Sequence, residues 1–223
     1  MNIKENIAAI KSTLPEGVIL VAVSKTKPVT DLMKAYEAGL RVFGENKIQE
    51  MARKWEQMPK DIMWHMIGHV QTNKVKYMAP FVALIHGVDS FKLLKEINKQ
   101  AIKHNRIINC LLQVHIAEED TKFGMNEEEL KAILISDTFK ELKNIKVMGL
   151  MGMATFTSDT AQIQKEFMYL KMLFERIKTD YPPISNLSME ILSMGMSNDY
   201  QLAIECGSNM VRIGSSIFGE RNY

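Results

Sequence analysis

Residues 18–28 read Val-Ile-Leu-Val-Ala-Val-Ser-Lys-Thr-Lys-Pro, an apolar and largely β-branched run that ends in a polar segment. A run of this kind, bounded by turn-forming residues, predicts a buried strand. The segment after it is amphipathic and ends near Gly39, which predicts a helix. The same strand-then-helix unit recurs along the chain. This alternation favours a parallel sheet covered by helices.

The strand pattern occurs in eight segments, which are Val18–Val23, Arg41–Phe43, Trp64–Ile67, Ala83–Val88, Ile108–Ile116, Lys146–Met151, Leu187–Ser193 and Met210–Ile213. Eight such units predict an α/β fold, a single (β/α)8 TIM-type barrel, with short loops because 223 residues is slightly under the usual ~250. Residues 2–13 predict an extra N-terminal helix. An open doubly wound sheet is the alternative. Without a Pro/Gly/Ser-rich linker or a repeat, we expect one domain over residues 1–223.

Composition excludes several classes of protein. The net charge of +2, from 28 basic and 26 acidic residues, argues against a nucleic-acid-binding surface. No apolar stretch reaches the length of a membrane span, and the N-terminus does not resemble a signal peptide, so we expect a cytoplasmic protein. Cys110 and Cys206 form no C-x-x-C pair and are expected to be reduced. His65 and His69 straddle a strand end, so no metal site is expected. The absence of a long apolar patch favours a monomer.

In a (β/α)8 barrel the functional site lies at the carboxyl ends of the strands. Counting by twos from Val21 and Val23 places Lys25 on the same strand face, at the rim of the predicted barrel. Desolvation there lowers the pKa of a lysine, and a neutral amine can form an imine with an aldehyde. An ordinary surface lysine after a strand is the alternative, and Lys27 is assigned to the surface in this way.

The segments after the seventh and eighth strands are Ser193-x-Gly195-x-Ser197 and Gly214-Ser215-Ser216. Barrels often bind phosphate with these two loops, because their backbone N–H groups and hydroxyls can donate to an anion. We therefore predict a phosphate site here, although glycine and serine are also ordinary turn residues.

Arg212 lies between Val211 and Ile213 in the last strand. A charged side chain in an apolar strand costs free energy unless it has a partner. Two interpretations remain open for it. Arg212 either forms an ion pair inside the barrel, for which Glu45 is the candidate, or donates hydrogen bonds to a bound ring or anion.

Several ordered motifs resemble those of one known family. They are Ala22-Val23-Ser24-Lys25-Thr26-Lys27-Pro28, Phe43-Gly44-Glu45-Asn46, Trp64-His65-x-Ile67-Gly68-x-x-Gln71-x-Asn73-Lys74, Lys122-x-Gly124, Gly149-Leu150-Met151, Ser193-Met194-Gly195-Met196-Ser197-x-Asp199 and Met210-Val211-Arg212-Ile213-Gly214. Together they span nearly the whole chain and resemble the YggS/PROSC family of pyridoxal phosphate homeostasis proteins. The family has a barrel similar to the N-terminal domain of alanine racemase.

The resemblance implies a set of ligand-binding residues for pyridoxal 5'-phosphate (PLP). Lys25 would hold the cofactor as a Schiff base, and Arg212 would face the pyridine nitrogen. Asn46 and His65 would border the ring. The phosphate would be held by Ser197, Gly214 and Ser215. Many family members have threonine at position 215, and serine retains the hydroxyl.

The resemblance also implies a function, which is vitamin B6 homeostasis by binding and delivering PLP without a specific catalytic reaction. PLP-requiring apoenzymes are the partners that such delivery would need. A PLP-dependent enzyme such as a small amino-acid racemase is the alternative, and it needs a second acid or base opposite Lys25. A barrel that acts on a sugar phosphate is a third hypothesis. The sequence leaves the roles of Lys74 and Lys122 open.

Overall fold

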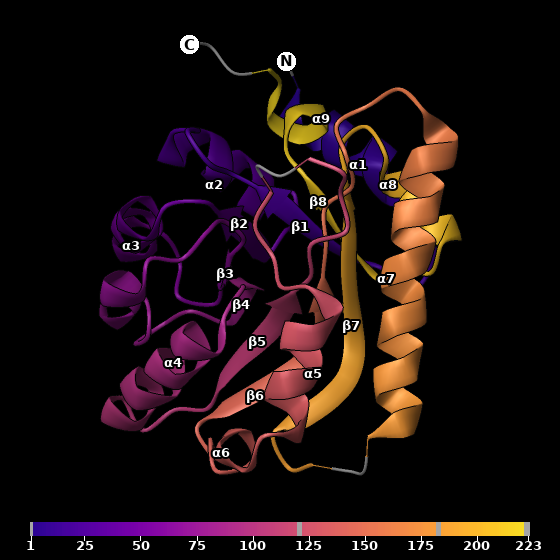
Figure 1. The fold of residues 1–223 in the computed structure, drawn as a ribbon. Coiled ribbons are helices and arrows are strands. Elements are labelled where there is room, and N and C mark those ends of the chain that lie inside the picture. The colour runs from indigo at the N-terminus through magenta and orange to yellow at the C-terminus, as the bar shows by residue number, and fades with distance from the viewer. Residues whose placement is uncertain (1, 120–121, 182–183, 221–223) are drawn as a thin grey trace.

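The computed structural model describes residues 2–119, 122–181 and 184–220. Within them, strands β1 to β8 pair in sequence order as a closed parallel barrel (Figure 1). The strands are β1 (Ile19–Val23), β2 (Val42–Glu45), β3 (Met63–Met66), β4 (Leu84–Val88), β5 (Ile108–Gln113), β6 (Ile145–Met151), β7 (Leu187–Met196) and β8 (Met210–Ile213). The (β/α)8 prediction is confirmed, and the open doubly wound sheet is excluded.

Helices connect the strands and surround the barrel (Figure 1). They are α1 (Ile3–Thr13), α2 (Val29–Glu37), α3 (Ile48–Gln57), the 3₁₀ helix η1 (Thr72–Tyr77), α4 (Phe91–Lys103), α5 (Glu127–Ile135), α6 (Asp137–Lys140), α7 (Thr160–Asp180), α8 (Tyr200–Glu205) and α9 (Ser215–Phe218). The extra N-terminal helix is α1, and Asn6 on it donates to the carbonyl of Ile217 in α9. Across the described ranges, no helix combines the length and the hydropathy that a membrane span requires.

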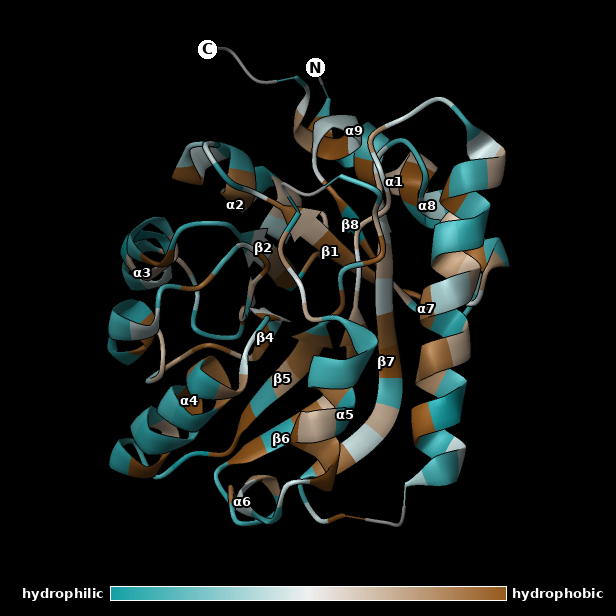
Figure 2. Cartoon of the chain, viewed as in Figure 1, coloured by the Kyte–Doolittle hydropathy of each residue, from teal (hydrophilic) through white to brown (hydrophobic). Residues whose placement is uncertain are grey.

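Apolar side chains fill two regions. The barrel interior contains a cluster formed by Val21, Leu84, Leu111, Met151 and Met210. A larger cluster lies between the strands and the surrounding helices. Figure 2 shows β1 as hydrophobic along its length, whereas the ribbon of α4 is mostly teal, the colour of hydrophilic residues, with brown positions between. A parallel strand buried on both faces reads as a continuous apolar run, which explains why the strands were detectable in the sequence.

Two strand ends differ from the sequence prediction by three residues, whereas the other strand bounds agree within two residues. β5 ends at Gln113 instead of Ile116, because Val114 forms only an isolated bridge with Met125. β7 continues to Met196, three residues beyond Ser193. Its pairing with β8 has an irregularity between Ser193 and Met196, and Gly195 adopts φ +94 there, a value that glycine accommodates most easily. Ser193 and Gly195 therefore belong to the strand, not to the loop after it.

The pairing of β1 with β8 closes the barrel. Val21 lies opposite Arg212, and Ala22 lies opposite Ile213. The segment that follows β1 and carries Lys25 is thereby placed beside the segment that follows β8 and carries Gly214 and Ser215. All strands run parallel, so their carboxyl ends form one rim.

A buried ionic cluster lies behind the Lys25 segment and joins β1, β2 and α3. The Lys54 amine on α3 donates to Glu45 Oε1 at 2.7 Å, to Glu50 Oε1 at 2.7 Å and to the carbonyl of Ser24 at 2.8 Å. The hydroxyl of Ser24 donates to the same oxygen of Glu45 at 2.5 Å. Burial raises the pKa of Glu45, and the adjacent Lys54 ammonium opposes that rise.

The same cluster holds the residue after Lys25. Thr26 has φ +65, a left-handed conformation that is unfavourable for a β-branched residue. Its backbone N–H donates to Glu50 Oε1 at 2.7 Å. Strained backbone of this kind persists when its surroundings over-determine it. The ionic cluster therefore fixes the backbone on both sides of Lys25.

Replacing Lys54 with methionine tests this structural role. Lys54→Met leaves the Glu45 carboxylate buried without its cation, so we expect the free energy of unfolding to fall by about 3–5 kcal/mol. Lys99→Met is the matched control, because Lys99 is exposed on α4 with its amine 4.0 Å from Glu96, and it should cost at most about 1 kcal/mol. Urea denaturation measures both changes. Equal effects of the two substitutions would show that the cluster does not stabilise the barrel.

Candidate functional site

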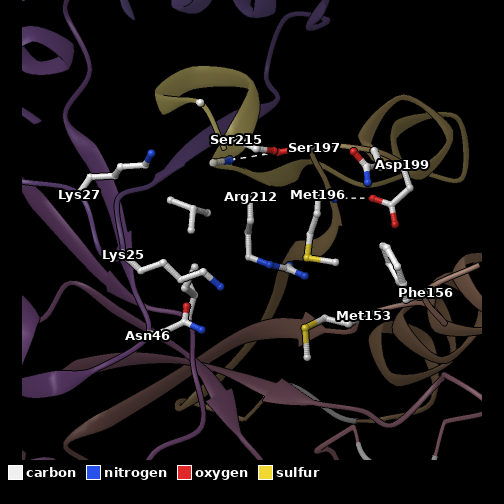
Figure 3. Close-up of a pocket in the computed structure, with 15 residues that line it drawn as sticks. Lys25, Lys27, Asn46, Met153, Phe156, Met196, Ser197, Asp199, Arg212 and Ser215 are labelled. Atoms are coloured by element: carbon white, nitrogen blue, oxygen red, sulfur yellow. Dashed lines mark hydrogen bonds between the residues drawn. The ribbon is translucent and has the colours of Figure 1, made fainter. Parts of the chain in front are cut away.

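A cavity of about 280 Å³ opens at the carboxyl ends of the strands, where the sequence places the site. It is lined by Val23, Lys25, Lys27, Asn46, Ile67, Met153, Phe156, Met196, Ser197, Asn198, Asp199, Arg212, Gly214, Ser215 and Gly219. In Figure 3, Lys25 and Asn46 reach the cavity from one side and Met153, Phe156 and Asp199 from the other, with Arg212 between them. Six of the seven PLP-binding residues that the family resemblance implies thus line one cavity, and His65 does not.

Lys25 stands at the boundary between the apolar barrel interior and the cavity. Val21 belongs to the interior cluster, whereas Val23 and Lys25 line the cavity, as the period of two along the strand predicts. The Lys25 side chain is half-buried. A primary amine is therefore presented at the edge of an apolar volume, where an aldehyde could reach it.

A polar wall of the cavity, next to Lys25, comes from the segments after β7 and β8. Ser197 Oγ accepts a hydrogen bond from the backbone N–H of Gly214 at 3.2 Å, and Ser215 begins α9 at the same wall. A Cβ at position 214 would lie 3.2 Å from both Cβ and O of Val23, so glycine lets the two segments approach closely. The first N–H groups of a helix lack intrahelical partners. Hydroxyls and backbone donors therefore gather here, as an anion requires.

Arg212 is buried and lines the cavity. Its Nη1 donates to Ser193 Oγ at 2.7 Å, and its Nη2 donates to the carbonyl of Gly152 at 3.0 Å. Burial lowers the pKa of Arg212 to about 10, and the nearby carboxylate of Asp199 opposes this shift. The guanidinium thus stays charged at neutral pH. Because Glu45 is paired with Lys54, the ion pair considered between Arg212 and Glu45 is wrong.

Ser193 does not take the position expected of an anion-binding loop residue. It lies within β7, its side chain is fully buried, and its hydroxyl is bound by Arg212. The exposed Ser216 is likewise absent from the cavity lining, although it was included in the predicted phosphate loop. The donors at this wall come instead from Ser197, Gly214 and Ser215.

Asn46 and His65 are placed differently from each other. Asn46 lines the cavity beside Lys25 (Figure 3). His65 lies on β3, is buried, and hydrogen-bonds His86 at 3.0 Å instead of lining the cavity. Burial lowers the pKa of His65 to about 3, so the ring is neutral. Among the described residues, no group of three or more His, Cys, Asp or Glu side chains could hold a metal ion.

Some cavity residues were not found from the sequence. Lys27, which the sequence analysis assigned to the surface, lines the cavity and donates to the carbonyls of Phe218 and Glu220 at 3.0 and 2.9 Å. Because side chains two residues apart along an extended segment lie on the same face, the position of Lys25 would have indicated that Lys27 also faces the cavity. Phe156 follows β6 and is 80% exposed, a property that no sequence pattern reveals.

Asp199 also lines the cavity. Burial raises the pKa of its carboxyl group, and its Oδ1 accepts a hydrogen bond from the backbone N–H of Met196.

Comparisons with known proteins identify the family of this chain. The model of the family "Alanine racemase, N-terminal domain" matches residues 1–222. The pyridoxal phosphate homeostasis protein of Aquifex aeolicus is 40% identical over 205 residues, which cover 92% of this chain and 87% of that protein.

Two solved structures show the same fold. PipY of Synechococcus elongatus PCC7942, with PLP bound, is 32% identical and has a TM-score of 0.88, with 97% of this chain and 100% of that chain covered. Alanine racemase of Bartonella henselae is 15% identical and has a TM-score of 0.74, and the match covers 100% of this chain and 61% of the racemase chain. At this identity the likeness concerns the fold alone. The chain therefore belongs to the alanine racemase N-terminal domain family, among the pyridoxal phosphate homeostasis proteins.

Proposed function

We propose that this protein binds PLP in the cavity, with Lys25 joined to its aldehyde as a Schiff base, and serves the intracellular homeostasis and delivery of the cofactor. The observation that carries the proposal is the convergence of Lys25 and the donors around Gly214 on one cavity. Relatives named as pyridoxal phosphate homeostasis proteins, and the PLP-bound PipY structure, support it.

The cavity suits PLP in size and chemistry. A volume of about 280 Å³ is at the small end of ligand sites, as a single vitamer requires. When bound, PLP supplies an aldehyde that condenses with a primary amine and releases water. Ser197, Gly214 and Ser215 would hold the phosphate, which would replace the present hydrogen bond between the first two. Ile67, Met153 and Met196 offer apolar surface to the ring.

Arg212 supports storage of the cofactor over catalysis. A guanidinium donates hydrogen bonds but has no acceptor, so it favours an unprotonated ring nitrogen. An unprotonated ring withdraws electrons less strongly from a bound substrate than a protonated ring does. We therefore propose that the protein lacks a specific catalytic reaction and transfers PLP to apoenzymes in the cytoplasm.

Borohydride reduction tests the assignment of Lys25. Incubation with PLP followed by reduction should add one phosphopyridoxyl group, and peptide mass spectrometry should locate it on Lys25. Lys25→Ala should lose the adduct, because the condensing amine is gone. Lys34→Ala is the control, since Lys34 is exposed on α2 and pairs with Asp31, and it should retain the adduct. A stoichiometric reducible adduct in Lys25→Ala would refute the assignment.

Loss of the α-proton of amino acids tests the racemase alternative, which needs a second acid or base. Asp199 lines the cavity and has a raised pKa, so it is the candidate that the structure offers for that role. In deuterated water with PLP, we expect ¹H NMR to show no faster exchange of alanine with the protein than with free PLP. Rapid exchange that Asp199→Asn abolishes would establish an enzyme instead of a carrier.

A further inference from the structure

A chain of buried polar side chains extends from the cavity into the barrel. Arg212 Nη1 lies 2.7 Å from Ser193 Oγ, which lies 3.2 Å from His86 Nδ1. The other nitrogen of that ring, Nε2, lies 3.0 Å from His65 Nδ1. The four residues come from β8, β7, β4 and β3 and are each at most 5% exposed. Four strands thus contribute to one hydrogen-bonded line that begins at the cavity.

The direction of these hydrogen bonds follows from the charge on Arg212. A guanidinium can only donate, so Ser193 Oγ accepts from it. If the hydroxyl accepted from His86 as well, its own proton would be buried without an acceptor, which costs free energy. Donation from Ser193 to His86 Nδ1 also directs the negative end of the Ser193 hydroxyl dipole and the negative end of the His86 ring dipole toward the positive guanidinium. His86 must then carry its proton on Nε2 and donate to His65 Nδ1.

The protonation states of the two histidines agree with this direction. Burial lowers the pKa of His65 to about 3. The pKa of His86 is also well below its usual value, chiefly because of burial and further because of the nearby charge of Arg212. Each ring is therefore neutral at pH 7 and carries a single N–H. A neutral ring can accept at one nitrogen and donate from the other, as a one-way chain requires.

We propose that Ser193, His86 and His65 form a one-way hydrogen-bond relay that positions the guanidinium of Arg212 for recognition of an aromatic ring nitrogen. The three are positioning residues that act through Arg212. In this arrangement His65 supports Arg212 through His86 and Ser193, instead of bordering the PLP ring as the family resemblance implies. The ligand named here rests on the proposed function, whereas the direction of the relay is a property of the protein alone.

The direction is tested in the wild-type protein without PLP. Long-range ¹H–¹⁵N NMR of the ¹⁵N-histidine-labelled protein at pH 7 distinguishes the two neutral tautomers and the charged ring. We expect both His65 and His86 to carry the proton on Nε2. A proton on Nδ1 of His86, or a charged ring at either position, would overturn the relay whether or not the protein binds PLP.

The role of the relay in ligand recognition is tested with two ligands. Ser193→Ala removes the bridge between Arg212 and His86, so the Kd for PLP should rise about tenfold, as expected for loss of support at a charged donor. The Kd for 1-deaza-PLP, which has no ring nitrogen, should change little. Ser188→Ala is the matched control, because Ser188 lies on the same strand, is only partly buried and bonds Glu190. It should affect neither ligand.

Two results would contradict this role: an equal loss of affinity for both ligands, or no loss for PLP. Failure of the wild-type protein to bind PLP would overturn the proposed function instead, while the NMR experiment would still decide the direction of the relay.

Discussion

The parallel pairing of β1 with β8 is the constraint on which the arrangement of the site depends. Val21 and Arg212 lie opposite each other in this pairing, although they are far apart in the sequence. Closure of the barrel places the Lys25 segment beside the start of α9, and Lys27 links them by donating to the carbonyl of Phe218. An open sheet would leave β1 and β8 unpaired and would not close this cavity.

Two sets of buried polar side chains support the site, and each set acts on a different part of it. The Lys54 cluster fixes the backbone around Lys25, including the strained Thr26. The line from Arg212 through Ser193 orients a charged donor at the cavity. Buried charges are costly unless they are well paired, and replacing them with apolar residues often stabilises a protein. We infer that these buried charges serve to position reactive and ligand-binding groups and not to maximise stability.

The fold could be predicted from the sequence because buried parallel strands are apolar runs and helices alternate with them. The carboxyl end of β7 could not be predicted from the sequence, because Gly195 resembles a turn residue but accommodates an irregularity within the strand. Ser193 pairs with Met151 and Met210, which belong to the interior cluster, so its inward position follows from the strand register. The pairing of Glu45 with Lys54 depends on how α3 packs against β2, which no local pattern encodes. The lysine and the glycine-rich segment were identified because strand ends are recognisable in sequence.

The central claim is that Lys25 and the donors at Ser197, Gly214 and Ser215 hold opposite ends of one PLP molecule. A crystal structure of the protein grown with PLP tests it most directly. The account predicts continuous electron density between Lys25 Nζ and the aldehyde carbon, with the phosphate within hydrogen-bonding distance of those three residues. Density joining PLP to another lysine, or a phosphate bound away from this wall, would contradict the account.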